Sequence, residues 1–257
     1  MSSDFNKSGM DNYLKELAKE YRRMVGKNMP AEIVLVGGAA ILANYGFRES
    51  TQDIDAIITA ASAMKDAITV VGDRYDLPSG WLNSDFIKTD SYSPKLIEFS
   101  CYYRTFANVV TVRTIEAEYL IAMKLRAGRQ YKYDLSDVIG ILAECKRSGN
   151  PVSPEQIRIA YENLYGKGAS MPESSKALLD RLAVVQDYEN EYAQVAMEEK
   201  QRAGLLRDFQ QNYPGAANAQ NVNSILERLK TLKENTPNHS GTDTAKAVSY
   251  THLRAHE

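Results

Sequence analysis

The chain has 257 residues, of which 44% are hydrophobic, so it can bury a core and should be globular. Its 31 Lys and Arg residues nearly balance its 33 Asp and Glu residues, and the formal net charge of -2 excludes a bulk electrostatic attraction to nucleic acids or membranes. No segment has the length and apolarity of a membrane span or a signal peptide, and the two cysteines lack metal-ligand or redox spacing. We therefore expect a cytoplasmic protein with no membrane partner.

Apolar periodicity predicts alternating helices and strands in the first part of the chain. The expected elements are a helix over 11–25, a strand over 33–36, a helix over 39–45, a strand over 53–59 and a helix over 62–71. Gly26 can end the first helix, and the pair Gly37-Gly38 separates the first strand from the second helix. Residues 72–94 contain two prolines and two glycines and are expected to form a long, mostly irregular connection.

The next segment, residues 95–103, alternates apolar and polar residues as a half-buried strand does. The expected inner face carries Ile97, Phe99 and Cys101, and the outer face carries Glu98 and Ser100. Residues 109–112 can pair with this strand as a hairpin. Two helices are then predicted, one from Thr114 to about Gly128 and one from Asp134 to about Arg147.

Only helices are predicted after the break at Gly149-Asn150-Pro151. They cover 153–165, 174–212 and the surroundings of 225–232. The fold class is therefore α/β (α+β), with a small mixed sheet flanked by helices. Its expected divisions are a first domain over 1–150, a helical C-terminal region over 151–235 and a disordered tail over 236–257.

The last ten residues, 248–257, need a separate interpretation. Their sequence, VSYTHLRAHE, resembles the translation of a transposase adapter end that is used in DNA sequencing, so we expect a sequencing artefact; the alternative is an ordinary disordered tail. His252 and His256 lie in this segment, and the third histidine, His239, lies in the polar tail. Catalysis or metal binding by histidine is therefore not expected.

One ordered set of motifs carries chemistry: a strand, Gly37-Gly38, a helix beginning at Ala39, and a strand that opens with Asp53-Ile54-Asp55. Glycines before a helix let the backbone approach a phosphate, and the helix N-terminus presents free N–H groups to it. Strand residues two apart share a face, so the two aspartates can hold Mg²⁺ or Mn²⁺ together. Glu98 is the candidate third carboxylate, although it can equally be a surface residue.

This ordered set resembles the nucleotidyltransferase superfamily, in which a Gly-Gly or Gly-Ser turn precedes Asp-x-Asp or Asp-x-Glu. More closely, the chain resembles the abortive-infection (AbiEii-like) and toxin-type minimal nucleotidyltransferases over residues 10–165. The residues that carry the closer resemblance are Val36 to Ala40, Arg48, Thr51, Asp53 to Asp55, Leu120 to Arg129, Asp134 and Asp137. The spacing between the glycines and the aspartates is about one residue longer than in the general pattern.

The resemblance implies roles for residues beyond the two aspartates. Lys124 would bind the nucleotide phosphates, Arg129 would assist it, and Asp134 or Asp137 would complete the site, with Arg48 and Thr51 close to the nucleotide. Other interpretations stay open: Lys124 can be a solvated helix lysine, and Asp134 and Asp137 can be a helix cap and a first-turn acid. The basic and tyrosine-rich segment 124–133 can bind a nucleic-acid backbone or simply form a helix surface.

The expected function is metal-dependent transfer of a nucleoside monophosphate from a nucleoside triphosphate to an acceptor hydroxyl, with release of pyrophosphate. By resemblance the acceptor would be RNA, above all the end of a tRNA, and the protein would be toxin-like with a cognate antitoxin. A protein side chain or a small molecule is the next expected acceptor. One alternative is a nucleotide-sensing or partner-binding module of a phage-defence system. The other is an α/β domain in which both motifs are coincidental.

Overall fold

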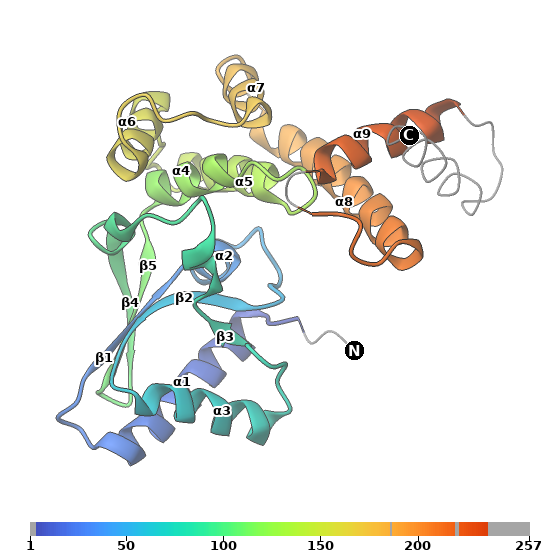
Figure 1. Cartoon of the computed structure of the whole chain (residues 1–257). Helices are drawn as coiled ribbons and strands as arrows, with labels where there is room; N and C mark the ends of the chain where they lie inside the picture. Colours follow the sequence, from blue (N-terminus) through green and yellow to red (C-terminus); the bar gives the residue numbers. More distant parts are fainter. Residues whose placement is uncertain (1–3, 186, 219–220, 236–257) are drawn as a thin grey trace. The chain divides into compact units, whose positions relative to one another are not determined.

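The computed structural model describes residues 4–185, 187–218 and 221–235 (Figure 1). The predicted disordered tail and the adapter-like segment lie outside these residues. The chain forms two compact units. Of the described residues, the first unit comprises those up to 128 and those from 137 to 189, and the second comprises residues 129–136 and those from 190 onward.

A mixed sheet of five strands forms the centre of the first unit, with the order β3-β2-β1-β5-β4. The strands are β1 (Ala31–Leu35), β2 (Ile54–Thr59), β3 (Leu82–Asn83), β4 (Ser100–Phe106) and β5 (Val110–Ile115). The central strand β1 runs antiparallel to β2 and parallel to β5. The predicted α/β class with a small mixed sheet is therefore confirmed.

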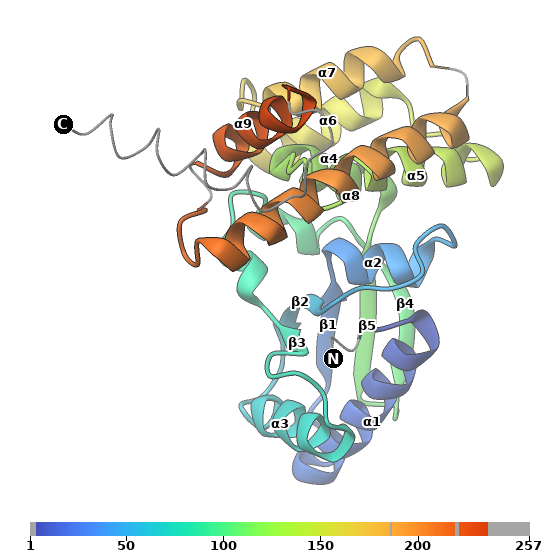
Figure 2. The same cartoon turned by 90° about the vertical axis from the view of Figure 1, so that its right-hand side faces the viewer.

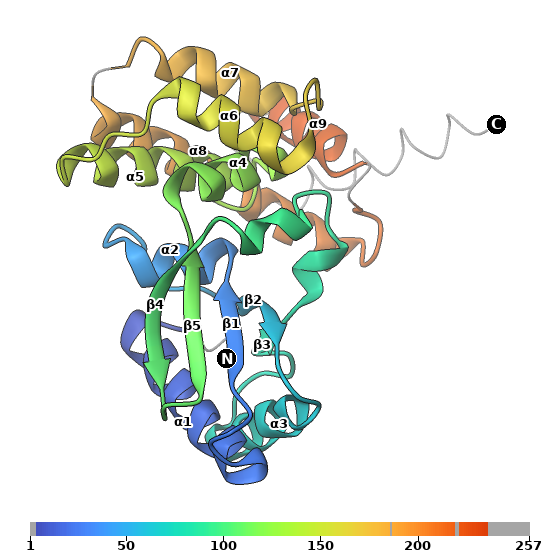
Figure 3. The ribbon, with the colours of Figure 1, turned by 90° about the vertical axis from the view of Figure 1, so that its left-hand side faces the viewer.

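Three helices lie on one face of this sheet (Figures 2 and 3). They are α1 (Lys7–Val25), α2 (Gly37–Asn44) and α3 (Ala63–Tyr75). The Asn6 side chain accepts the N–H of Gly9 and so caps the start of α1. Glu20 of α1 lies buried against α3 and pairs with Arg74 at 2.9 Å. The helical spacing of Leu14, Leu17, Tyr21 and Met24 predicts an apolar face; the first three of these side chains are buried, and Met24 at the end of the helix is half-buried.

Four further helices contribute to the first unit. They are α4 (Ala117–Ala127), the greater part of α5 (Asp134–Arg147), α6 (Pro154–Tyr165) and α7 (Glu173–Leu182). The predicted division at residue 150 does not coincide with the division into units, because α6 and α7 are bonded to α4. Asn163 donates to the Tyr119 hydroxyl at 3.0 Å, and Ser175 donates to the Leu125 carbonyl at 2.7 Å.

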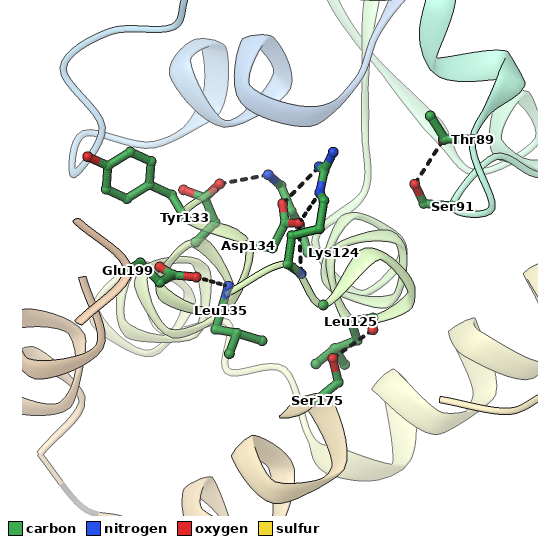
Figure 4. Close-up of polar contacts among 12 residues, drawn as sticks. Thr89, Ser91, Lys124, Leu125, Tyr133, Asp134, Leu135, Ser175 and Glu199 are labelled. Atoms are coloured by element: carbon green, nitrogen blue, oxygen red, sulfur yellow. Dashed lines mark hydrogen bonds and ion pairs between the residues drawn. The ribbon is translucent and has the colours of Figure 1, made fainter. Parts of the chain in front are cut away.

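The second unit contains α8 (Tyr188–Asn212), except for its first two residues, and α9 (Val222–Asn235). The two helices pack through a small apolar core that includes Leu206, Val222 and Leu226. Tyr131, from the connection between α4 and α5, packs against the same core. Glu199 of α8 then caps the start of α5, because its carboxylate accepts the N–H of Leu135, as Figure 4 shows, and also the N–H of Ser136.

Two of the predicted elements are wrong in detail. The strand expected over 95–103 begins at Ser100, because Pro94–Ile97 forms a 3-10 turn instead. Two bonds to α6 hold this turn: Ser93 Oγ donates to the Leu164 carbonyl at 2.8 Å, and Lys95 Nζ donates to the Asn163 carbonyl at 2.9 Å. As a result Ile97, expected on the inner face, is 38% exposed.

The single helix expected over 174–212 is also wrong, because it is two helices, α7 and α8. The first helix ends at Leu182, and the break after it contains Val184 and Val185, whose β-branched side chains disfavour a helix. Asp187 then starts α8 by accepting the N–H of Glu189 at 3.1 Å.

Candidate functional site

The glycine turn joins β1 to α2, as its position in the sequence predicted. Gly37 has a φ of 54°, in the left-handed region that favours glycine. Gly38 is packed too closely for a side chain: a Cβ there would lie 2.6 Å from Thr51 Oγ1 and 3.1 Å from Arg48 Nη2. The turn therefore leads into a helix N-terminus that faces the side chains of Arg48 and Thr51.

The two predicted metal ligands lie beside this turn. Asp55 is half-buried on β2, and its carbonyl accepts the N–H of Val36 at 3.0 Å. A Cβ at Gly37 would lie 3.8 Å from Asp55 Oδ2, so this carboxylate faces the turn. Asp53 is exposed and lies immediately before the first residue of β2. The sequence interpretation that places an Asp-x-Asp pair at a strand end next to Gly-Gly agrees with this geometry.

The segment between α2 and β2 is anchored from the N-terminus of the chain. Thr51 and Phe5 exchange two backbone hydrogen bonds, of 2.7 and 2.9 Å, in an isolated antiparallel bridge. Within this segment Arg48 Nε donates to the Ser50 carbonyl at 3.0 Å. Arg48 and Thr51 are therefore held against Gly38 by fixed backbone, which their positions in the sequence do not reveal.

Asp137 brings the predicted phosphate ligand Lys124 together with Arg48. Its Oδ2 lies 2.7 Å from Arg48 Nη1 and 2.8 Å from Lys124 Nζ. Lys124 is 6% exposed and Asp137 is 3% exposed, so Lys124 is not a solvated helix lysine. The three charged groups come from the α2–β2 connection, from α4 and from α5.

The other predicted pair, Arg129 and Asp134, belongs to the second unit. Asp134 is fully buried and accepts from Arg129 Nε at 2.7 Å and from the Arg129 backbone N–H at 3.2 Å. Asp134 is also the first residue of α5. Of the two acids that the resemblance left open, the structure places Asp137 with Lys124 and Arg48 in the first unit.

Glu98, the predicted third carboxylate, does not lie on a strand. It is exposed and follows the 3-10 turn Pro94–Ile97, which replaces the expected strand start. Among the residues that the structure describes, no group of three or more His, Cys, Asp or Glu side chains is arranged to hold a metal ion. The two aspartates are therefore not joined by Glu98.

The basic and tyrosine-rich segment 124–133 does not form one exposed patch. Arg126 contacts the Tyr161 hydroxyl and the Ser170 carbonyl, and it stacks over the Tyr165 ring at 5.3 Å. Tyr131 packs into the apolar core of the second unit. Of the Lys, Arg and Tyr residues in this segment, only Lys132 and Tyr133 are exposed. The arrangement therefore does not support the interpretation of segment 124–133 as a nucleic-acid-binding surface.

Sequence reasoning missed one residue beside the acids. Asn83 on the two-residue strand β3 pairs in register with Asp55. Its side chain is fixed, because it donates to the Gly80 carbonyl and accepts the Asp85 N–H. A strand of two residues has no periodicity, so no sequence signal could have indicated it.

Residues 12–143 match the model of a protein family described as nucleotidyltransferase of unknown function (DUF6036). The matched segment covers just over half of the chain and contains the glycine turn, both aspartates, Lys124 and Asp137. No curated protein and no solved structure gives a significant match. Of the helices that the structure describes, none has the length and apolarity needed to span a bilayer.

Proposed function

The chain belongs to this family of nucleotidyltransferases, and from that premise we propose that it transfers a nucleoside monophosphate from a nucleoside triphosphate to an acceptor hydroxyl. Pyrophosphate is the leaving group, and the bond broken joins the α- and β-phosphates. The observation that carries the proposal is the position of the Asp55 carboxylate, which faces Gly37 across the start of α2.

The triphosphate would bind at the glycine turn. The first N–H groups of α2 have no partners within their own helix, and the helix dipole adds a partial positive charge there. Arg48 lies against Gly38 and supplies a planar fork of N–H donors for phosphate oxygens. Lys124, joined to Arg48 through Asp137, supplies a second cation.

Asp53 and Asp55 would hold the metal ion. Two carboxylates are a suitable protein donor set for Mg²⁺, which is often bound by one or two carboxylates with water and substrate phosphates completing its coordination. Mn²⁺ accepts the same ligands. A bound divalent cation would neutralise the charge that develops on the phosphates. The chain's own residues would orient the triphosphate so that its α-phosphate faces the acceptor.

The proposed acceptor is RNA, above all the end of a tRNA, and the proposed setting is a toxin-like protein with a cognate antitoxin. The support for both is the resemblance to toxin-type nucleotidyltransferases over residues 10–165. A second candidate function is a nucleotide-binding or partner-binding module with little catalysis, in the same kind of defence system. It is favoured by one observation, the lack of a third acidic ligand beside the two aspartates among the described residues.

One experiment separates the two functions. The full chain is incubated with Mg²⁺, each α-³²P-labelled nucleoside triphosphate in turn, and total cellular RNA or protein. Transfer is expected to label one acceptor class, and the double variant Asp53→Ala, Asp55→Ala is expected to abolish it. Label transfer that persists in the double variant overturns the proposed mechanism. Nucleotide binding without transfer to either acceptor pool supports the second function.

A further inference from the structure

Asp137 is a buried carboxylate that two cations share. Its Oδ2 accepts from Arg48 Nη1 at 2.7 Å and from Lys124 Nζ at 2.8 Å. Arg48 and Asp137 are 89 positions apart in the sequence, so only the tertiary fold brings them together. A buried carboxylate between two cations fixes the position of both.

The guanidinium of Arg48 is held at two of its three nitrogens. Nε donates to the Ser50 carbonyl at 3.0 Å, and Nη1 donates to Asp137. The third nitrogen, Nη2, lies 3.1 Å from the position that a Cβ of Gly38 would occupy. Because the guanidinium is planar, the bonds at Nε and Nη1 determine where Nη2 points, which is toward the glycine turn.

We infer that Asp137 is a positioning residue of the triphosphate site: it touches neither nucleotide nor metal, and holds Arg48 and Lys124 ready for polyphosphate oxygens. This inference rests on the proposed function and assigns the acid a different role from that of a nucleotide or metal ligand. Cations that are already oriented lose little conformational freedom when the ligand binds, so affinity depends on the carboxylate that orients them. The ligand class is a polyphosphate, whether or not it carries a nucleoside.

Isothermal titration calorimetry of the full chain tests this. The probes are inorganic tripolyphosphate and a nonhydrolysable nucleoside triphosphate analogue, each with Mg²⁺. Asp137→Asn keeps the side-chain shape and removes the charge, and we expect the Kd for both probes to rise by about tenfold or more at unchanged stoichiometry. The matched control is Asp11→Asn, because Asp11 also accepts from two side chains, Tyr103 and Arg104, but lies on α1. Its Kd should equal that of the unaltered chain.

The stoichiometry separates positioning from folding. A variant that merely folds poorly binds fewer probe molecules with the same Kd, and that result would overturn the inference. An unchanged or lower Kd for Asp137→Asn would overturn it as well, while leaving the proposed function standing. If the unaltered chain bound neither probe, the proposed function would fail together with the inference.

Arg48→Lys provides a second variant should Asp137→Asn fail to fold. A lysine keeps the charge, but its single ammonium cannot reproduce the fixed fork that joins Asp137 to the glycine turn. We expect Arg48→Lys to raise log Kd by at least half as much as Arg48→Ala raises it. In a background of Arg48→Ala, the substitution Asp137→Asn should have a clearly smaller effect, since part of its action passes through Arg48. Wild-type affinity in Arg48→Lys, or full additivity in the double variant, contradicts the inference.

Discussion

Glu199 caps the first turn of α5 by accepting the N–H of Leu135 at 2.9 Å (Figure 4). The same carboxylate accepts the N–H of Ser136 at 3.2 Å. Burial raises the pKa of Glu199 to about 7, and the neighbouring charge of Asp134 acts in the same direction, while the hydrogen bonds to Ser136 and Leu135 oppose the rise. The carboxyl group that accepts the N–H groups of Leu135 and Ser136 within the second unit therefore titrates near neutral pH.

We expect the stability of the protein to depend on pH through Glu199. Its folded-state pKa lies above the ordinary value of 4.5, so its contribution is fully present below about pH 4.5 and is lost as the pH rises through about 7. The loss is at most about 3 kcal/mol. Urea unfolding between pH 5 and 8 measures it, and Glu199→Gln should flatten the profile. Parallel profiles for the two proteins would show that Glu199 is not responsible.

Gly140 should not tolerate alanine. A Cβ at this position would lie 2.5 Å from the ring of Phe47, which packs on α5. The ring or the helix would have to move, and we expect Gly140→Ala to lower the free energy of unfolding by about 1–3 kcal/mol. Denaturant unfolding measures the change.

A matched helical glycine provides the control for Gly140. Gly204 of α8 has open space where a Cβ would be. Gly204→Ala should therefore raise the free energy of unfolding by up to about 1 kcal/mol, because alanine favours a helix. Equal destabilisation by both substitutions would rule out the proposed contact with Phe47 as the cause.

Gly38→Ala is expected to impair nucleotide transfer more than stability. The added methyl group would push aside Thr51 Oγ1 and Arg48 Nη2, which face the turn. A displacement of about 1 Å at a catalytic site can lower the rate by about 100-fold, so we expect kcat/KM for the nucleoside triphosphate to fall by about 10- to 100-fold. Gly46→Ala, with open space around the position, serves as the control in the same assay and should match the unaltered protein.

Transfer activity should require a divalent cation and the carboxylate of Asp55. Removing metal with EDTA is expected to abolish transfer, and adding Mg²⁺ or Mn²⁺ in excess should restore it. Asp55→Asn should lower kcat by about 100-fold or more, because an amide oxygen is a weaker ligand for a hard cation. Asp208→Asn, on the exposed surface of α8, controls for the change of charge. Transfer that is unaffected by EDTA would argue against a metal at the two aspartates.

The local parts of this fold could be predicted from the sequence. The buried strand, the glycine turn and the strand that follows Asp53 are adjacent in the chain, and short-range periodicity and glycine conformation determine them. The sequence therefore predicted that a glycine turn and two aspartates lie together at one end of the sheet. It also predicted the α/β class and the helices of the C-terminal part of the chain.

Only the tertiary structure decided which distant side chains meet. Residues 95–103 alternate like a strand, but bonds to α6 hold Pro94–Ile97 as a turn, and Glu98 follows that turn instead of lying on a strand. Asp134 and Asp137 look alike in the sequence, and the packing of α5 places the second of them on Arg48 and Lys124. Such contacts depend on how helices and strands pack across the whole unit, and a buried charge is stable only where that packing supplies its partners. Local periodicity in the sequence does not indicate which residues those partners are.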